Sequence, residues 1–110
     1  SFNFGVPTAA LWSAHRHGAP FVTVVLNNQS YLASKLPVIA LYPDGVSVRE
    51  NDFGETQLTP DTDYATLAKA CGGSGRRVHT PAEMGDAASW ALAEADQGRC
   101  AVLDVRLPQP

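Results

Sequence analysis

The stretch FVTVVLNN, residues 21–28, decides the fold and ends on two adjacent asparagines. Residues 21–26 are apolar and mostly β-branched, with only Thr23 polar. That composition is typical of a strand covered on both faces, as in a parallel sheet. Asparagine is a poor strand former, but it is a good turn residue and its side-chain oxygen can bind a metal ion. The sequence therefore predicts a buried strand that ends abruptly in a polar turn.

One helix is predicted before this strand in the sequence and another after it. The first begins at Pro7, which suits the first position of a helix, continues through Ala14 and is stopped by Gly18. The second can be capped by Thr59 or Asp61. Its apolar stripe has the spacing i, i+3, i+4, i+7 and consists of Tyr64, Leu67, Ala68 and Cys71.

The third predicted helix has the clearest start. Thr80 can be its N-cap, Pro81 its first helical residue and Glu83 the acid that completes a capping box. Gly98 ends it. Its predicted buried stripe is Met84, Ala87, Ala88, Ala91, Leu92 and Ala95.

Short strands are predicted at residues 77–79 and 100–107. Residues 36–58 lack clear periodicity and contain two prolines and two glycines, so we predict a long loop with at most a short helical turn or hairpin. The element order predicts an α/β fold, a three-layer, doubly wound parallel sheet with helices on both faces. Ligands of such sheets bind at the carboxyl ends of the strands, where the asparagine pair lies.

Composition excludes several classes of function. The 110 residues suit one small domain, and 45% are hydrophobic and 17% charged, as in soluble globular proteins. The net charge of −3 argues against a nucleic-acid partner, and no apolar run is long enough to cross a membrane. Cys71 and Cys100 form no CxxC pair, so we expect two buried, reduced thiols rather than a disulfide or a reactive thiol. Reduced thiols favour a cytoplasmic location.

Several polar groups have a structural interpretation beside a functional one. NNQS, residues 27–30, can be an ordinary Asx turn after a strand. Asp61 and Asp63 are acids at a helix start and not a catalytic pair. Asp104 and Arg106 alternate on a strand, where they can pair with each other.

In its context, the asparagine pair resembles the cofactor-binding motif of thiamine-diphosphate-dependent enzymes, which runs Gly-Asp-Gly, a spacer, then Asn-Asn. SFNFGVPTAALWSAHRHGAPFVTVVLNNQSY, residues 1–31, is most similar to the branch of benzoylformate decarboxylases and acetolactate synthases. The matching features are the Ser opening, Asn3 before an aromatic residue, ALW, Pro20 before the strand, and NNxxY. Residues 63–107 resemble the end of the family's diphosphate-binding domain, whose last strand carries an acid such as Asp104.

The resemblance implies that the chain binds thiamine diphosphate and Mg²⁺. It implies that the Asn28 side-chain oxygen and the Ser30 carbonyl bind the metal, whose third protein ligand, the Asp of Gly-Asp-Gly, is expected just before Ser1. Ser1 is expected to contact the diphosphate, and Tyr31 to pack at the cofactor or hold the loop. Asn27 is expected to brace the loop rather than bind the metal. One departure is Leu32, where the family usually has glycine.

The resemblance also implies a domain organisation. Residues 1–110 would be a single partial domain, the C-terminal diphosphate-binding domain of a 2-keto-acid decarboxylase or carboligase, lacking its first strand. The remainder of the parent enzyme would add pyrimidine-binding and central domains in a homodimer or homotetramer. The Glu that activates the cofactor would lie on another domain, so we name no catalytic residue and expect the isolated chain to be inactive.

Residues 34–36 align with a stretch that often lines the substrate pocket in this branch. The branch often has bulky apolar residues there, so the substrate stays open. The choice between decarboxylation and carboligation stays open as well. The alternative to an enzyme is a non-catalytic α/β association module or a remnant of such an enzyme.

Overall fold

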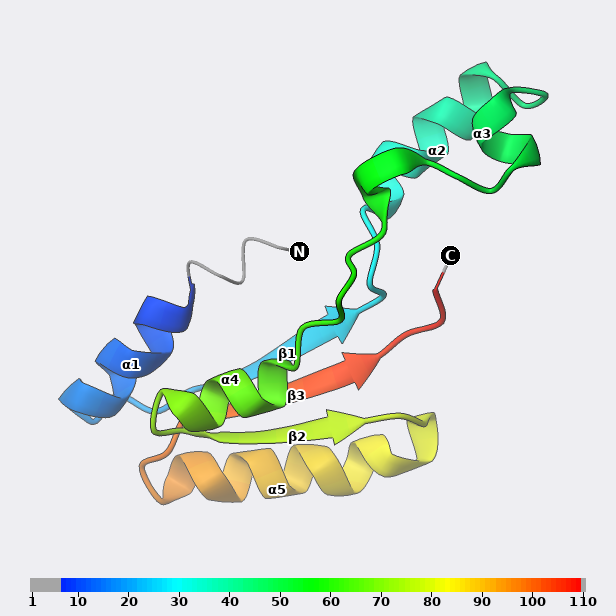
Figure 1. Cartoon of the computed structure of the whole chain (residues 1–110). Coiled ribbons are helices and arrows are strands. Elements are labelled where there is room, and N and C mark those ends of the chain that lie inside the picture. The colour runs from blue at the N-terminus through cyan, green and yellow to red at the C-terminus, as the bar shows by residue number, and fades with distance from the viewer. Residues whose placement is uncertain (1–6, 110) are drawn as a thin grey trace. The chain divides into compact units, whose positions relative to one another are not determined.

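A parallel sheet of three strands, in the order β1–β3–β2, organises the larger of two structural units (Figure 1). The computed structural model describes residues 7–109, without the side chains of Pro7 and Glu55. Residues 7–27 and 63–107 form this unit, which we call the sheet unit. Residues 28–62, with residues 108 and 109, form a second unit, which we call the loop unit.

The strands of the sheet unit are β1 (Val22–Asn27), β2 (Ser74–Val78) and β3 (Ala101–Arg106). All pairings are parallel, and β3 lies in the centre with its first four residues buried. Asp104 lies opposite Val25 on one side and Arg77 on the other. This confirms the predicted α/β fold class with a parallel sheet.

Helices cover both faces of the sheet. α1 (Pro7–His17) and α4 (Tyr64–Ala70) pack on one face, and α5 (Met84–Asp96) packs on the other (Figure 1). The core on the first face comprises Leu11, Ala14, Val25, Tyr64, Ala68, Cys100 and Val102. The core on the second face comprises Val78, Ala87, Ala91, Ala101 and Leu103. Alternate residues of β3 therefore serve opposite cores, as the period of a strand requires.

Several local predictions are confirmed with small changes of boundary. Gly18, at φ 62°, follows α1, and Glu83 completes the capping box ahead of α5. The first strand runs one residue further than predicted, so Asn27 belongs to the strand and not to the turn. β2 begins at Ser74, three residues before its predicted start.

Two predictions in the sheet unit are wrong. Asp63, and not Thr59 or Asp61, caps α4, because its carboxylate accepts a hydrogen bond from the Thr66 N–H. Leu92 is 61% exposed, so the buried stripe of α5 is narrower than predicted. Both cysteines are free thiols, of which Cys100 is buried and Cys71 only partly so.

The loop unit is more helical than predicted. It contains α2 (Leu32–Leu41), α3 (Val46–Arg49) and the 3-10 turn η2 (Gly54–Thr56), where the sequence predicted a loop. α2 was missed because Pro37 lies inside it and because nearly all of its residues are apolar, which hides any amphipathic stripe. Its one charged residue, Lys35, is buried with its ammonium group 4.5 Å from the centre of the Phe53 ring.

No helix within residues 7–109 is long and apolar enough to cross a membrane.

Gly75 provides a test of the packing between α4 and β2. A Cβ at this position would lie 2.1 Å from the Ala65 carbonyl oxygen, an overlap with backbone that cannot move aside easily. We expect Gly75→Ala to lower the free energy of unfolding by an amount near the upper end of the roughly 1–3 kcal/mol that overpacking costs. The matched control is Gly85→Ala in α5, where a Cβ meets nothing within 4 Å, and it should stabilise the helix. Urea unfolding of both variants measures the difference, and equal stabilities would contradict this packing.

The contacts of Glu94 with Arg99 and Ser74 can be tested through the pH dependence of stability. Its carboxylate is bonded to the Arg99 guanidinium at 2.6 and 2.9 Å and accepts a hydrogen bond from the Ser74 hydroxyl. These contacts lower the pKa of Glu94 from 4.5 to about 2. Because the pKa is lower in the folded state, the stabilisation is complete above pH 4.5 and is lost as the pH falls towards 2. We expect Glu94→Gln to be less stable at neutral pH and to flatten the stability profile over this range; an unchanged profile in thermal unfolding would argue against the contacts.

Candidate functional site

The turn after β1 is an Asx turn made by Asn28. The Asn28 side-chain oxygen accepts a hydrogen bond from the Ser30 N–H at 3.1 Å. Between them Gln29 adopts φ 55°, a left-handed conformation that few residues other than glycine adopt readily. The structural interpretation of NNQS as an Asx turn is therefore correct for residues 28–30, and it sets the position of the Asn28 oxygen.

Ser30 then forms an antiparallel bridge with Gln57 inside the loop unit. The flanking hydrogen bonds run from the Tyr31 N–H to the Thr56 carbonyl at 2.7 Å and from the Leu58 N–H to the Gln29 carbonyl at 2.8 Å. In this pattern the N–H and the carbonyl of Ser30 both point away from Gln57. The Ser30 N–H meets the Asn28 oxygen, so the Ser30 carbonyl and the Asn28 oxygen share one edge of the loop.

This edge fits the donor set that a hard cation needs. Amide and carbonyl oxygens are ligands of Mg²⁺, and each has two lone pairs, of which the Asn28 oxygen uses one for the Ser30 N–H. Both groups are neutral, so they add no negative charge beside an anionic ligand. Among the described residues, no group of three or more His, Cys, Asp or Glu side chains could hold a metal ion.

The structure says less about the other predicted site residues, Tyr31 and Ser1. Tyr31 directly precedes α2, and its ring is about one-third exposed. Ser1, the predicted diphosphate contact, lies outside the described residues. The Thr56 hydroxyl is buried and has no hydrogen-bond partner among residues 7–109. Sequence reasoning did not single out Thr56.

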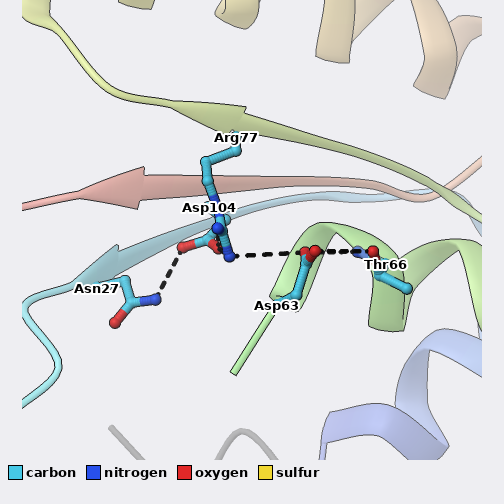
Figure 2. A network of polar contacts seen from close by, with 5 residues as sticks. All are labelled: Asn27, Asp63, Thr66, Arg77 and Asp104. Carbon is cyan, nitrogen blue, oxygen red and sulfur yellow. Dashed lines mark hydrogen bonds and ion pairs between the residues drawn. The ribbon is translucent and has the colours of Figure 1, made fainter. Parts of the chain in front are cut away.

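Asn27 belongs to a different set of contacts, in the sheet unit. Its amide nitrogen donates to one oxygen of Asp104 at 3.0 Å, and Asp104 is fully buried (Figure 2). The other Asp104 oxygen faces Arg77, at 3.1 Å from Nε and 3.0 Å from Nη2. Asn27 therefore braces the sheet through its side chain.

The prediction that Asp104 pairs locally with Arg106 is wrong. The structure pairs Asp104 with Arg77 because the two lie directly opposite each other on β2 and β3. Residues opposite each other on neighbouring strands are closer than residues two apart along one strand.

Asp63 extends these contacts to the start of α4. Its carboxylate accepts hydrogen bonds from the N–H and the hydroxyl of Thr66, both at 2.9 Å, and lies 3.7 Å from Arg77 Nη2 (Figure 2). The Thr66 N–H, then its hydroxyl, then the charge of Arg77 lower the pKa of Asp63. Sequence reasoning missed this network, although an acid in the middle of the apolar run AVLDV signals a buried charge that needs a partner.

Comparison with known proteins identifies a family and a relative. Residues 3–105 match the family described as thiamine pyrophosphate enzyme, C-terminal TPP binding domain. The chain belongs to this family. It is also similar to a probable sulfoacetaldehyde acetyltransferase of Rhizobium meliloti (strain 1021), with 31% identity over 107 residues. That match covers 96% of this chain and 17% of the relative. No solved structure matches the chain.

Membership of the family identifies the chain as a thiamine-diphosphate-binding domain of the kind found at the C-terminus of these enzymes. It confirms the resemblance at the level of the family, and not at the level of the benzoylformate decarboxylase and acetolactate synthase branch.

Gln29 provides a test of the geometry of the turn. A side chain in the left-handed conformation costs roughly 1 kcal/mol, and more when it is β-branched. We expect Gln29→Gly to be as stable as the parent or slightly more stable, and Gln29→Val to be less stable by more than about 1 kcal/mol. Thermal unfolding measures both. If the valine variant were as stable as the glycine variant, the left-handed turn would be contradicted.

Proposed function

We propose that the Asn28 side-chain oxygen and the Ser30 carbonyl bind a Mg²⁺ ion that holds the diphosphate of thiamine diphosphate. The observation that supports this most directly is the Asx turn, which gathers the two oxygens at one edge of the loop. Mg²⁺ is usually held by few protein ligands and completes its octahedron with phosphate oxygens and water. The two ligands from this chain are neutral, so they add no negative charge beside the diphosphate.

Thiamine diphosphate, when bound, supplies an electron sink for reactions at a carbonyl carbon. The residues of this chain bind and orient that group and do not exchange protons with the substrate. Asn28 and Ser30 would hold the metal end, Tyr31 would support the loop on which they lie, and Ser1, outside the described residues, would contact the diphosphate. The acid that activates the cofactor belongs to another domain.

The chain spans 17% of the length of the curated relative it matches, so the whole enzyme is itself a proposal. We place this domain in a larger cytoplasmic enzyme with pyrimidine-binding and central domains, assembled as a homodimer or homotetramer. Residues 1–110 form one partial domain of it. A Gly-Asp-Gly sequence directly before Ser1 in the full-length protein would supply the third metal ligand. A different tripeptide there would favour the alternative, a non-catalytic association module.

The reaction we propose is decarboxylation or carboligation of a 2-keto acid. A second candidate is transfer of an acetyl group, because the relative with 31% identity is named a probable sulfoacetaldehyde acetyltransferase. Assay of the full-length protein with thiamine diphosphate and Mg²⁺ distinguishes the candidates. Consumption of pyruvate or benzoylformate supports the first, and consumption of sulfoacetaldehyde alone supports the second. Cofactor binding without consumption of sulfoacetaldehyde or of any member of a panel of 2-keto acids would contradict both.

Asn28→Ala in the full-length protein tests the metal site. Loss of one of the two ligands that this chain supplies should raise the Mg²⁺ concentration that half-saturates thiamine diphosphate binding by at least about tenfold. Calorimetric titration measures this directly. The matched control is Gln57→Ala, which removes an exposed amide from the same loop and should leave Mg²⁺ dependence unchanged. If Asn28→Ala kept the Mg²⁺ dependence of the parent, Asn28 would not be a ligand.

A further inference from the structure

The loop unit contains a buried cation that the proposed function does not use. Lys35 is the one charged residue of α2, and only 8% of it is exposed. Its ammonium group lies 4.5 Å from the centre of the Phe53 ring, which is a cation–π contact. Lysine is almost never buried unless its charge is compensated, so the face of this ring stabilises the charge where it lies.

The Asx turn of residues 28–30 is paired with a second stretch of the loop unit, residues 53–58, which we call the returning segment. The pairing consists of the bridge between Ser30 and Gln57 and of the two hydrogen bonds that flank it, at 2.7 and 2.8 Å. In these bonds the two neighbours of Ser30 point towards the returning segment, so the Ser30 carbonyl points away from it. The edge that the Ser30 carbonyl shares with the Asn28 oxygen therefore depends on the returning segment staying in place.

This pairing is too short to hold itself together. It has one bridge and two flanking hydrogen bonds, and even a longer isolated pair of strands is at best marginally stable in water. Residues 36–52 lie between the two paired segments, and bringing the ends of such a loop together costs conformational entropy. Other contacts between the start of α2 and the returning segment must therefore stabilise the pairing.

The contact between Lys35 and Phe53 can do so, because each residue is tied locally to its own side of the pairing. The Lys35 N–H donates to the Tyr31 carbonyl at 3.2 Å, so Lys35 lies one helical turn after the paired residues. On the other side, the Asp52 carboxylate accepts a hydrogen bond from the Gly54 N–H at 2.9 Å, which bends the chain at Phe53 directly before η2. The contact therefore joins the two segments next to the bridge.

We infer that Lys35 and Phe53 are positioning residues for the Asx turn. Their contact holds the returning segment beside Ser30 and so keeps the Asn28 oxygen and the Ser30 carbonyl at one edge of the loop. This inference rests on the proposed function of Asn28 and Ser30. Neither positioning side chain can bind the metal itself, because an ammonium group has no lone pair and a phenyl ring has no oxygen or nitrogen. They act through the backbone of the paired segments.

The first test measures the Mg²⁺ dependence of thiamine diphosphate binding by calorimetry in the full-length protein. Phe53→Leu removes the aromatic face and keeps an apolar side chain, whereas Lys35→Met removes the charge and keeps the stem. Without the contact, only a fraction of the molecules holds the turn in its binding conformation, and the apparent affinity falls by that fraction. We expect each variant to raise the half-saturating Mg²⁺ concentration about three- to thirtyfold, the range that a cation–π contact allows.

The matched control is Tyr42→Leu, which removes an aromatic ring that is 66% exposed at the end of α2 and should leave Mg²⁺ affinity unchanged. Phe53→Tyr keeps the aromatic face and should keep the affinity of the parent. A merely structural role for the contact would lower the thermal stability of Phe53→Leu and Lys35→Met and leave their Mg²⁺ affinity unchanged. That result would overturn the inference.

The double variant tests whether the two side chains act as a pair. If loss of their contact is the cause, Lys35→Met combined with Phe53→Leu should bind Mg²⁺ no more weakly than the single variant that binds it less tightly. Losses that add would show two independent effects and would contradict the pairing. Weaker binding in Lys35→Met alone, with Phe53→Leu equal to the parent, would indicate direct contact between the ammonium group and the diphosphate and would also overturn the inference.

Amide hydrogen exchange tests the same contact in the absence of metal and cofactor. The Tyr31 and Leu58 N–H groups donate across the pairing and exchange only when it opens. Exchange followed by mass spectrometry should be faster for the peptides that contain them in Phe53→Leu and Lys35→Met than in the parent or Tyr42→Leu. Equal exchange in all four proteins would overturn the inference. If Phe53→Leu fails to fold, Lys35→Met must show both faster exchange and weaker Mg²⁺ binding.

Failure of this inference can be distinguished from failure of the proposed function. If Asn28→Ala weakens Mg²⁺ binding and the Phe53 and Lys35 variants do not, only the positioning role is lost. If the parent shows no Mg²⁺-dependent binding of thiamine diphosphate, the proposed function itself is wrong, and the positioning role is overturned with it.

Discussion

The buried carboxylate of Asp104 is the constraint on which the sheet unit depends. An ionised group with no exposure to water is costly unless it is paired and hydrogen-bonded. Both of its oxygens are satisfied, one by Arg77 on β2 and the other by Asn27 on β1. This is possible only if β3 lies between the other two strands in the observed order and register. The same requirement explains why a charged residue can stand in the middle of an otherwise apolar strand.

That constraint gives the asparagine pair a physical explanation. Asn27 completes the environment of a buried charge, and Asn28 begins the turn that brings its own oxygen and the Ser30 carbonyl to one edge of the loop. Replacing either asparagine with aspartate would be unfavourable, for a different reason at each position. At position 27 it would oppose Asp104, and at position 28 it would add negative charge beside the diphosphate that we propose is held there.

Features with local signals could be predicted from the sequence. The start of the last helix is predicted by its capping residues, Thr80, Pro81 and Glu83. The β-branched run before Asn27 predicts a buried parallel strand. α2 could not be predicted, because its proline and its nearly uniform apolarity remove the periodic signal of a helix. Asp63 was missed as a cap because Thr59 and Asp61 are equally suitable by residue type, and only the contacts with Thr66 distinguish it.

The residues of the candidate site and its surroundings also differ in whether a local sequence signal predicts them. The motif that contains Asn28, Ser30 and Tyr31 is short and contiguous, so resemblance to the family could indicate it. The family match confirms the family, and the roles of these three residues stay a proposal. Asp104 contacts Asn27, which lies 77 positions away in the chain. Such a contact can be predicted only when the strand register is known. Local pattern favoured Arg106 as the partner of Asp104, and the sheet supplies Arg77 instead.

The most direct test of this account is a crystal structure of the full-length protein with thiamine diphosphate and Mn²⁺ in place of Mg²⁺, with the metal located by its anomalous scattering. The account predicts one metal ion bound to the Asn28 side-chain oxygen and the Ser30 carbonyl, at roughly the 2.0–2.1 Å typical of Mg²⁺ ligands or slightly longer, and bridged to the diphosphate. A metal held elsewhere, with the Asn28 oxygen bonded only to the Ser30 N–H, would contradict it.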